Sequence, residues 1–240
     1  MAVTKDEVRD VFCWAAGRRL SDFSSWPEAV HVLVNEYGFS EDAIQTNESE
    51  FFSGVLPSSN EHKQGWVQTG LNGEIDFVAH ALRNNFSAIR LNPEKLRGNP
   101  YGFDFDVLWD SLWEPAEYKY RSVPYFMAQR DVRLPAAFAI PLNTNKCHRY
   151  RDGDKRLRLI IHVDWPSQFS EKYDVSVPSH KEVYLSSFQD LWGEQILTHN
   201  RRHKYVERRG DDVNAEASYY VDSRELTPIG EIFPAMKPWW

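Results

Sequence analysis

The chain has 240 residues, a formal net charge of −7 at pH 7, 42% hydrophobic residues and 26% charged residues. This length suits one large domain or two small ones and can bury a substantial core. The acidic balance argues against a protein that simply coats nucleic acid, because such proteins are normally basic. It is compatible with an enzyme that binds DNA through a local basic cleft.

The sequence carries no sign of a membrane span, a secretory signal or a disulfide framework. No apolar run approaches the roughly 20 residues that a transmembrane helix requires, and the first residues lack the apolar core of a signal peptide. The cysteines are Cys13 and Cys147, which are far apart and not in a spacing typical of a metal site. We therefore expect a cytoplasmic protein without disulfides and without a membrane partner.

The first hundred residues are expected to be mainly helical. Thr4 and Glu7 have the spacing of a capping box, and apolar residues at helical spacing follow them. Ser25 predicts the start of a second helix, and Gly38 predicts its end. Residues 45–74 are polar and rich in turn-forming residues, so they predict a loop or irregular structure.

A third helix is predicted over residues 74–84, and the chain then becomes rich in strands. Residues 157–165 form the clearest strand pattern, and residues 136–142 are a short apolar run between prolines. Residues 183–197 predict a strand that passes into a helix after its first few residues. Residues 218–221 predict a last strand at a sheet edge.

Helices before and after a central group of strands predict an α/β or α+β domain, in which helices flank a mixed sheet. No segment has the composition of a linker. We therefore predict a single domain over residues 1–240, with a mainly helical part over residues 1–100 and a sheet core over residues 101–225.

Residues 103–120 carry the most informative pattern in the chain. Asp104 and Asp106 lie in an apolar run, and Glu117 and Lys119 lie in a second extended segment after a short turn. Side chains two residues apart share one face of a strand. A hairpin of the two segments therefore gathers carboxylates and an amine in a small volume. Carboxylates at short range repel unless a hard divalent cation lies between them, and such a cation supports phosphodiester hydrolysis.

This spacing resembles the active-site motif of the PD-(D/E)xK nuclease superfamily, which includes many type II restriction endonucleases. In that motif an aspartate on one strand is followed, about ten or more residues later, by Glu-x-Lys on the next strand. Here Asp106 stands 11 residues and Asp104 stands 13 residues before Glu117. The chain departs from the family pattern because a phenylalanine, and not a proline, precedes each aspartate.

The resemblance implies a Mg²⁺-dependent endodeoxyribonuclease that cuts double-stranded DNA sequence-specifically, as a homodimer with a restriction-endonuclease-like fold. Asp106 and Glu117 are then the metal ligands, and Asp104 is a substitute or second ligand. We favour Asp106 because the apolar residues after it read as the buried continuation of a strand. Lys119 is expected to position the attacking water and to stabilise charge on the phosphate.

Two shorter strings add to the resemblance. Some blunt-cutting restriction endonucleases follow the Glu/Asp-x-Lys strand with a strand that ends in Val-Asp-Trp, and then with a Ser-Phe-x-x-Leu segment that enters a helix. Residues 163–165 and 187–191 of this chain have these sequences in the same order. The resemblance then covers roughly residues 100–195.

Two basic clusters are candidates for contact with DNA, because cationic patches neutralise phosphates. The first cluster lies on a segment that we expect to be hairpin-like and contains Lys146, Arg149, Arg151, Lys155, Arg156 and Arg158. The second contains Arg201, Arg202, Lys204, Arg208 and Arg209. The candidates for hydrogen bonds to bases are Asn143, Asn145, Arg149 and Arg151.

Two interpretations of other classes stay open. The 14% aromatic residues and the basic clusters also suit a non-catalytic module that binds nucleic acid or protein. His162, Asp164 and His203 have the residue types of the two-His-one-carboxylate site of Fe²⁺/2-oxoglutarate oxygenases. The polar and mostly helical stretch that leads to His203 is unlike the many strands that such an oxygenase needs.

Overall fold

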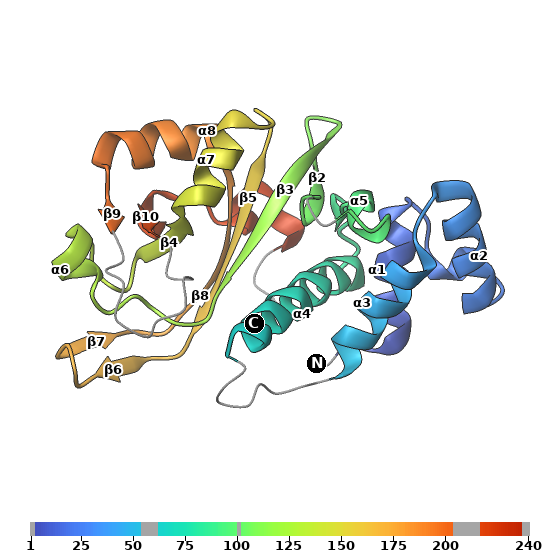
Figure 1. The fold of residues 1–240 in the computed structure, drawn as a ribbon, viewed down its shortest axis with the longest axis horizontal. Coiled ribbons are helices and arrows are strands. Elements are labelled where there is room, and N and C mark those ends of the chain that lie inside the picture. Colours follow the sequence, from blue (N-terminus) through green and yellow to red (C-terminus); the bar gives the residue numbers. More distant parts are fainter. Residues whose placement is uncertain (1–2, 54–61, 100–101, 204–216, 237–240) are drawn as a thin grey trace. The chain divides into compact units, whose positions relative to one another are not determined.

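The computed structural model describes residues 3–53, 62–99, 102–203 and 217–236, and the protein has a mixed α/β fold (Figure 1). The chain divides into two compact units, Met1–Tyr118 and Lys119–Pro238. The boundary falls inside a strand. A boundary of this kind leaves no compositional signal of a linker in the sequence.

The first unit begins with helices whose starts and ends follow local signals. The helices are α1 (Lys5–Ala15), the 3₁₀ helix η1 (Leu20–Asp22), α2 (Trp26–Tyr37), α3 (Glu41–Ser53), α4 (His62–Arg83) and α5 (Pro93–Leu96). The predicted capping box is confirmed, because the Glu7 N–H donates to Thr4 Oγ1 and the Thr4 N–H donates to Glu7 Oε2. Ser25 caps α2, and Gly38 ends it at a φ of 68°, where glycine has no Cβ to clash.

The prediction of a loop over residues 45–74 is wrong for residues 45–53 and 62–74, which belong to α3 and α4, while residues 54–61 lie outside the described residues. The sequence of α3 is polar, but Ile44 is fully buried. The helix packs against α1 and α4 (Figure 1). Tertiary packing of this kind supplies most of the stability of a helix in a protein, so a weak local pattern was no reliable guide.

Three antiparallel strands complete the first unit: β1 (Ile89–Leu91), β2 (Phe105–Trp109) and β3 (Leu112–Arg121), which continues past the unit boundary. Asp110 and Ser111 connect β2 to β3 with φ values of 46° and 69°. Two positive φ angles in a two-residue loop are typical of the hairpin turn that matches the twist of the strands. The hairpin sets Phe105 opposite Ala116 and Val107 opposite Glu114.

The second unit contains further strands, connected by short helices. Its strands are β4 (Ala139–Asn143), β5 (Arg158–Trp165), β6 (Gln168–Ser170), β7 (Val175–Val177), β8 (His180–Ser187), β9 (Arg202–His203) and β10 (Ser218–Asp222). Its helices are α6 (Ala128–Val132), α7 (Thr144–Asp152), α8 (Phe188–Leu191), the π-helical η2 (Trp192–Leu197), the 3₁₀ helices η3 (Ser223–Glu225) and η4 (Pro234–Met236), and α9 (Ile229–Ile232). Strands β1, β2, β3, β5 and β8 form a mixed five-stranded sheet in this order, and β4, β10 and β9 form a three-stranded sheet.

Two predictions for the second unit are confirmed and two are wrong. Strand β5 covers the predicted residues 157–165 almost completely, and residues 183–197 pass from β8 into α8 and η2. Strand β10 is not at an edge, because it pairs with β4 on one side and with β9 on the other. The first basic cluster begins on α7 and not on a hairpin. Cys147 and Tyr150, three residues apart, bury one side of this helix.

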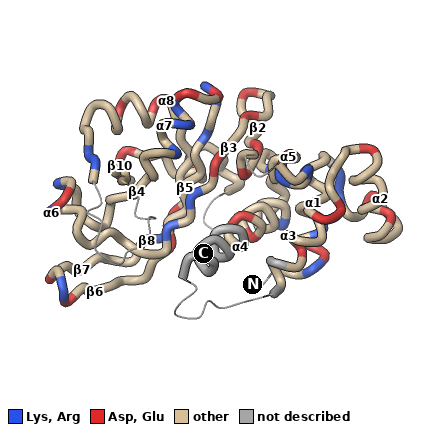
Figure 2. Tube along the Cα trace, viewed as in Figure 1, with Lys and Arg blue, Asp and Glu red and all other residues tan. Residues whose placement is uncertain are grey.

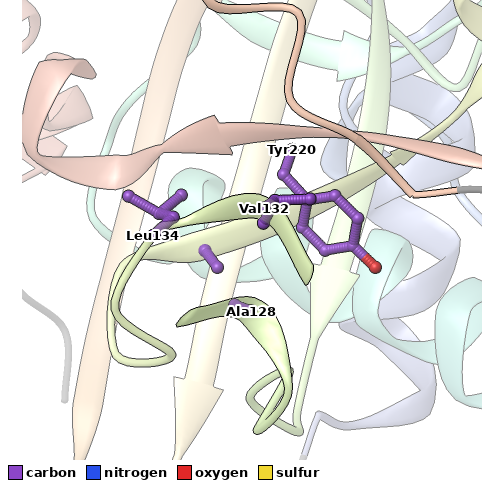
Figure 3. Close-up of a cluster of buried hydrophobic side chains, with 5 residues drawn as sticks. Ala128, Val132, Leu134 and Tyr220 are labelled. Atoms are coloured by element: carbon purple, nitrogen blue, oxygen red, sulfur yellow. The ribbon is translucent and has the colours of Figure 1, made fainter. Parts of the chain in front are cut away.

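Helix α6 packs on the three-stranded sheet through a compact apolar cluster. Ala128, Val132 and Leu134 meet Tyr220 of β10, and Ala139 of β4 completes the cluster (Figure 3). The Tyr125 ring stacks on Tyr220, with 4.8 Å between the ring centroids. These contacts hold the loop before β4 in place over the sheet.

Within the described part of the chain, we find no helix that combines the length and the apolar character needed to cross a bilayer.

An ion pair between α1 and α4 leads to a prediction about stability and pH. Arg83 Nε lies 2.7 Å from Glu7 Oε1, and this hydrogen bond, together with those from Thr4, outweighs burial and lowers the pKa of Glu7 from 4.5 to about 2. Because the pKa is lower in the folded state, the pair stabilises the fold above about pH 4.5, and this contribution is lost as the pH falls towards 2.

We expect Glu7→Gln to lower the free energy of unfolding at pH 7 by only about 0.5–1 kcal/mol, since the pair is partly exposed and solvent screens it. Gln at this position retains the capping box. Urea unfolding at pH 7 and pH 3 measures the effect. The difference between wild type and variant should shrink at pH 3, and an equal or larger difference at pH 3 would contradict the assignment.

Candidate functional site

The candidate site in the first unit is built around Asp104, which directly precedes β2. Lys95 Nζ on α5 lies 3.0 Å from Asp104 Oδ1 and also pairs with Glu74 Oε2 on α4. The side chains of Glu74, Lys95 and Asp104 are only 12%, 22% and 15% exposed. Burial disfavours the charged ammonium, but the two carboxylates outweigh burial, and the pKa of Lys95 is raised. Two acids from separate elements therefore share one cation.

The second oxygen of Asp104 is tied to the neighbouring strand. Asp104 Oδ2 accepts a hydrogen bond of 2.8 Å from the Tyr118 N–H of β3. The pairing of β2 with β3 ends at Phe105 opposite Ala116, and Asp104 lies in a bend directly before the strand. Glu117 follows Ala116 on β3 and is only 4% exposed. Asp104 and the buried Glu117 therefore lie at the same end of the hairpin, each next to its last pair of residues.

Asp106 pairs with Pro115, two residues before Glu117, and so lies on the same face of the hairpin as Glu117, but groups of the chain itself occupy both of its oxygens. Arg90 of β1 donates to Asp106 Oδ2 from Nε at 3.2 Å and from Nη2 at 3.1 Å, and Asn92 Nδ2 donates to Asp106 Oδ1 at 2.8 Å. The guanidinium of Arg90 also lies over the Trp113 ring, 4.1 Å from its centroid. Burial raises the pKa of Asp106, while Arg90 and Asn92 oppose this effect.

Asn92 connects Asp106 to the helix that carries Lys95. The Asn92 N–H donates to the Asp104 carbonyl oxygen at 3.1 Å, and Asn92 Oδ1 accepts from the Glu94 N–H at 2.9 Å as the N-cap of α5. One side chain thus starts the helix and attaches it to Asp106. Because α5 has a single turn, these contacts fix where Lys95 points.

Sequence reasoning missed Glu74, Lys95, Arg90 and Asn92 as members of this site. Asn92 followed by Pro93 is a local signal for a helix start that could have located α5. No local pattern connects Glu74 with Asp104, because 30 residues separate them along the chain. Their meeting depends on the packing of α4 against the hairpin region, where the Phe77 ring lies 5.7 Å from Phe105 and 5.5 Å from Tyr118.

Lys119 follows Glu117 by two residues on β3 and belongs to the second unit. There its charge acts on the buried thiol of Cys147 on α7. Burial raises the pKa of Cys147 to about 12, and Lys119 opposes this effect. Glu117 and Lys119 share a face of β3 because they are two positions apart.

The first group of predicted DNA contacts lies on or next to α7, which carries several basic residues (Figure 2). Asn143 Oδ1 caps the helix by accepting from the Lys146 N–H at 3.0 Å, and Asn145 is exposed. Arg149 is exposed and lies over the ring of the adjacent Tyr150. Arg151 pairs with Asp152 at 2.7 Å.

The second group meets the first at a pair of aromatic rings. The Arg151 guanidinium lies 5.5 Å from the Trp192 ring centroid, and the Arg202 guanidinium lies 5.8 Å from that of Tyr219. These two rings are in edge contact, with 5.7 Å between centroids. We call these four residues the arginine–aromatic surface. Arg201 is next to it on the chain, while Lys204 lies outside the described residues.

The residues of the oxygenase interpretation have separate partners. The His162 ring is in edge contact with Tyr120, Asp164 pairs with Lys181 at 3.6 Å, and His203 pairs with Asp131 at 3.5 Å. Among the residues that the structure describes, no three or more His, Cys, Asp or Glu side chains are grouped to hold a metal ion. The geometry gives this interpretation no support.

No family model, no curated protein and no solved structure matches this chain.

Proposed function

We propose that this protein is a Mg²⁺-dependent endodeoxyribonuclease of the PD-(D/E)xK type that acts on double-stranded DNA. One observation carries the proposal: the carboxylates of Asp104 and Glu74 share a single cation, the ammonium of Lys95, and Asp104 lies at the end of the hairpin where the buried Glu117 also lies. Acids gathered in this way suit a hard divalent cation.

The residues present fit Mg²⁺. This ion is usually held by one or two carboxylates together with waters and substrate phosphates, so it needs no cage of three or more protein ligands. Asp104 and Glu74 provide two carboxylates, Glu117 provides a third acid at the same end of the hairpin as Asp104, and the Lys95 ammonium already marks a cation position between the first two. A bound Mg²⁺ lowers the pKa of a water molecule and polarises the scissile phosphate.

The remaining roles come from the motif and from the second unit. Lys119, the lysine of Glu-x-Lys, is proposed to orient the attacking water and to stabilise charge on the phosphate. The arginine–aromatic surface is proposed to contact the DNA backbone through its guanidinium groups, because these groups pair with phosphates. We also propose sequence-specific cutting and a two-fold homodimer. These two points follow only from the resemblance to type II restriction endonucleases.

A plasmid-nicking assay tests this function. We expect wild-type protein to convert supercoiled plasmid to open-circular or linear DNA in Mg²⁺ and to stop when Mg²⁺ is chelated. Lys119→Ala should lower the rate at least a hundredfold, because it removes the positive charge that stabilises the transition state.

Lys172→Ala is the matched control, since Lys172 is an exposed lysine in the second unit that lies over Tyr173. It should cut as the wild type does. Cleavage that survives Lys119→Ala would move the chemistry away from this motif, and absence of cleavage by the wild type under all metal conditions would contradict the proposal.

A second candidate function is a nucleic-acid-binding module without catalysis, and the arginine–aromatic surface favours it. The same experiment separates the two candidates. A non-catalytic module predicts that the plasmid is retarded on the gel in a salt-dependent manner but stays uncut with Mg²⁺.

A further inference from the structure

We infer that Lys95 is the built-in counter-ion of the Glu74–Asp104 pair, so that Lys95 and a divalent cation exclude each other there, and that Asp106 is a positioning residue that holds Lys95 in place. This inference rests on the proposed metal-dependent function. It goes beyond that function because it assigns a role to a lysine outside the Glu-x-Lys motif.

The geometry of Lys95 is the first reason. Its ammonium contacts one oxygen of Asp104 and one oxygen of Glu74, and all three side chains are largely buried. Two carboxylates that approach each other away from bulk water need a positive charge between them. In the structure this charge is the ammonium, which therefore takes the place that a metal ion would need.

The attachment of α5 is the second reason. Asp106 accepts from the Asn92 side chain, Asn92 caps α5, and α5 presents Lys95 to Asp104. Arg90 occupies the other oxygen of Asp106 from the opposite strand. With both oxygens engaged, Asp106 acts on the site through Asn92 and α5.

The Lys95 ammonium and Mg²⁺ compete because both need the same carboxylate oxygens of Glu74 and Asp104. Mg²⁺ binds carboxylate oxygens at about 2.0–2.1 Å and holds waters around itself, so the ammonium cannot keep its place between the same oxygens. The lysine stem is flexible enough to move the ammonium away. The measured affinity for the metal must therefore include the loss of the two Lys95 contacts.

Calorimetric titration of the full chain with Mn²⁺ and with Mg²⁺, without DNA, tests this inference. Lys95→Met keeps the length and apolar stem of the side chain but removes the ammonium. We expect the variant to bind the metal at least tenfold more tightly than the wild type. Asp104→Asn, which removes a ligand charge, should bind at least tenfold more weakly.

Arg97→Met is the matched control, since it removes a positive charge at the end of the same helix, where Arg97 pairs with the exposed Glu94. It should leave the affinity within about twofold of the wild type. An unchanged or weaker affinity of Lys95→Met, in a variant that still melts cooperatively, would overturn the inference.

Asp106→Asn gives a second readout should Lys95→Met fail to fold. A positioning role predicts that Asp106→Asn binds the metal at least as tightly as the wild type, because the hold on Lys95 is weakened. A tenfold weaker affinity would show that Asp106 is itself a ligand and would overturn the inference. Binding is measured without DNA, so it does not depend on nuclease activity. If the affinities follow the predicted order but the protein does not cut DNA, the nuclease function is contradicted and the inference about Lys95 stands.

Discussion

Glu117→Gln is expected to lower the rate of Mg²⁺-dependent DNA cleavage at least a hundredfold, which corresponds to about 2.7 kcal/mol of transition-state free energy. The substitution keeps the shape of the side chain but replaces a carboxylate by a neutral amide. A buried acid at the end of the hairpin that also carries Asp104 then no longer contributes charge to the site. Single-turnover rates on supercoiled plasmid measure the effect, and circular dichroism verifies the fold.

Glu114→Gln provides the matched control on the same strand. Glu114 is 8% exposed and Glu117 is 4% exposed, so both are buried acids of β3. Glu114 lies opposite Val107 and three residues before Glu117, so the two acids are on opposite faces of β3. We expect Glu114→Gln to cut DNA within about threefold of the wild-type rate. Equal losses in the two variants would mean that the face of the hairpin does not matter for activity.

Phe105→Ala is expected to lower the free energy of unfolding by about 3–5 kcal/mol, the range found for large buried aromatic residues. Phe105 is fully buried and follows directly after Asp104. Its ring lies 5.7 Å from Phe77 of α4 and 5.4 Å from Tyr118 of β3. Removing it leaves a cavity among the elements that position Glu74, Asp104 and Glu117. Urea unfolding at constant pH measures the loss.

Phe169→Ala is the matched control, because Phe169 is 58% exposed on β6. Its truncation should change the free energy of unfolding by no more than about 0.5 kcal/mol. A loss below about 1 kcal/mol for Phe105→Ala would mean that the core behind the hairpin can collapse around the missing ring. Since Phe105 contacts elements that carry the site, we also expect the variant to lose cleavage activity.

Features that depend on neighbours in the chain were predictable from the sequence. The capping box of Thr4 and Glu7, the end of α2 at Gly38 and the turn at Asp110–Ser111 are each local hydrogen-bonding or backbone preferences, and the structure has all of them. Strand β5 was recognisable from its run of apolar residues. The loop predicted over residues 45–74 failed because α3 owes its stability to packing that no local pattern records.

For the candidate site, alternation along two extended segments was enough to predict that Asp106 and Glu117 share one face of a hairpin whose turn is also locally encoded. Alternation did not distinguish between the two aspartates, because they are two residues apart in the sequence. In the structure Asp106 lies within β2, whereas Asp104 lies in a bend directly before the strand.

The partners of the two aspartates follow from the packed fold: Asp104 pairs with Lys95, which also pairs with Glu74, while Asp106 pairs with Arg90 and Asn92. These partners come from α4, α5 and β1, and their approach follows from burying apolar side chains such as Phe77 and Phe105 together. Apolar burial joins residues that are distant in the chain and leaves no local pattern in the sequence. Two aspartates with the same local spacing therefore received different partners only when the core packed.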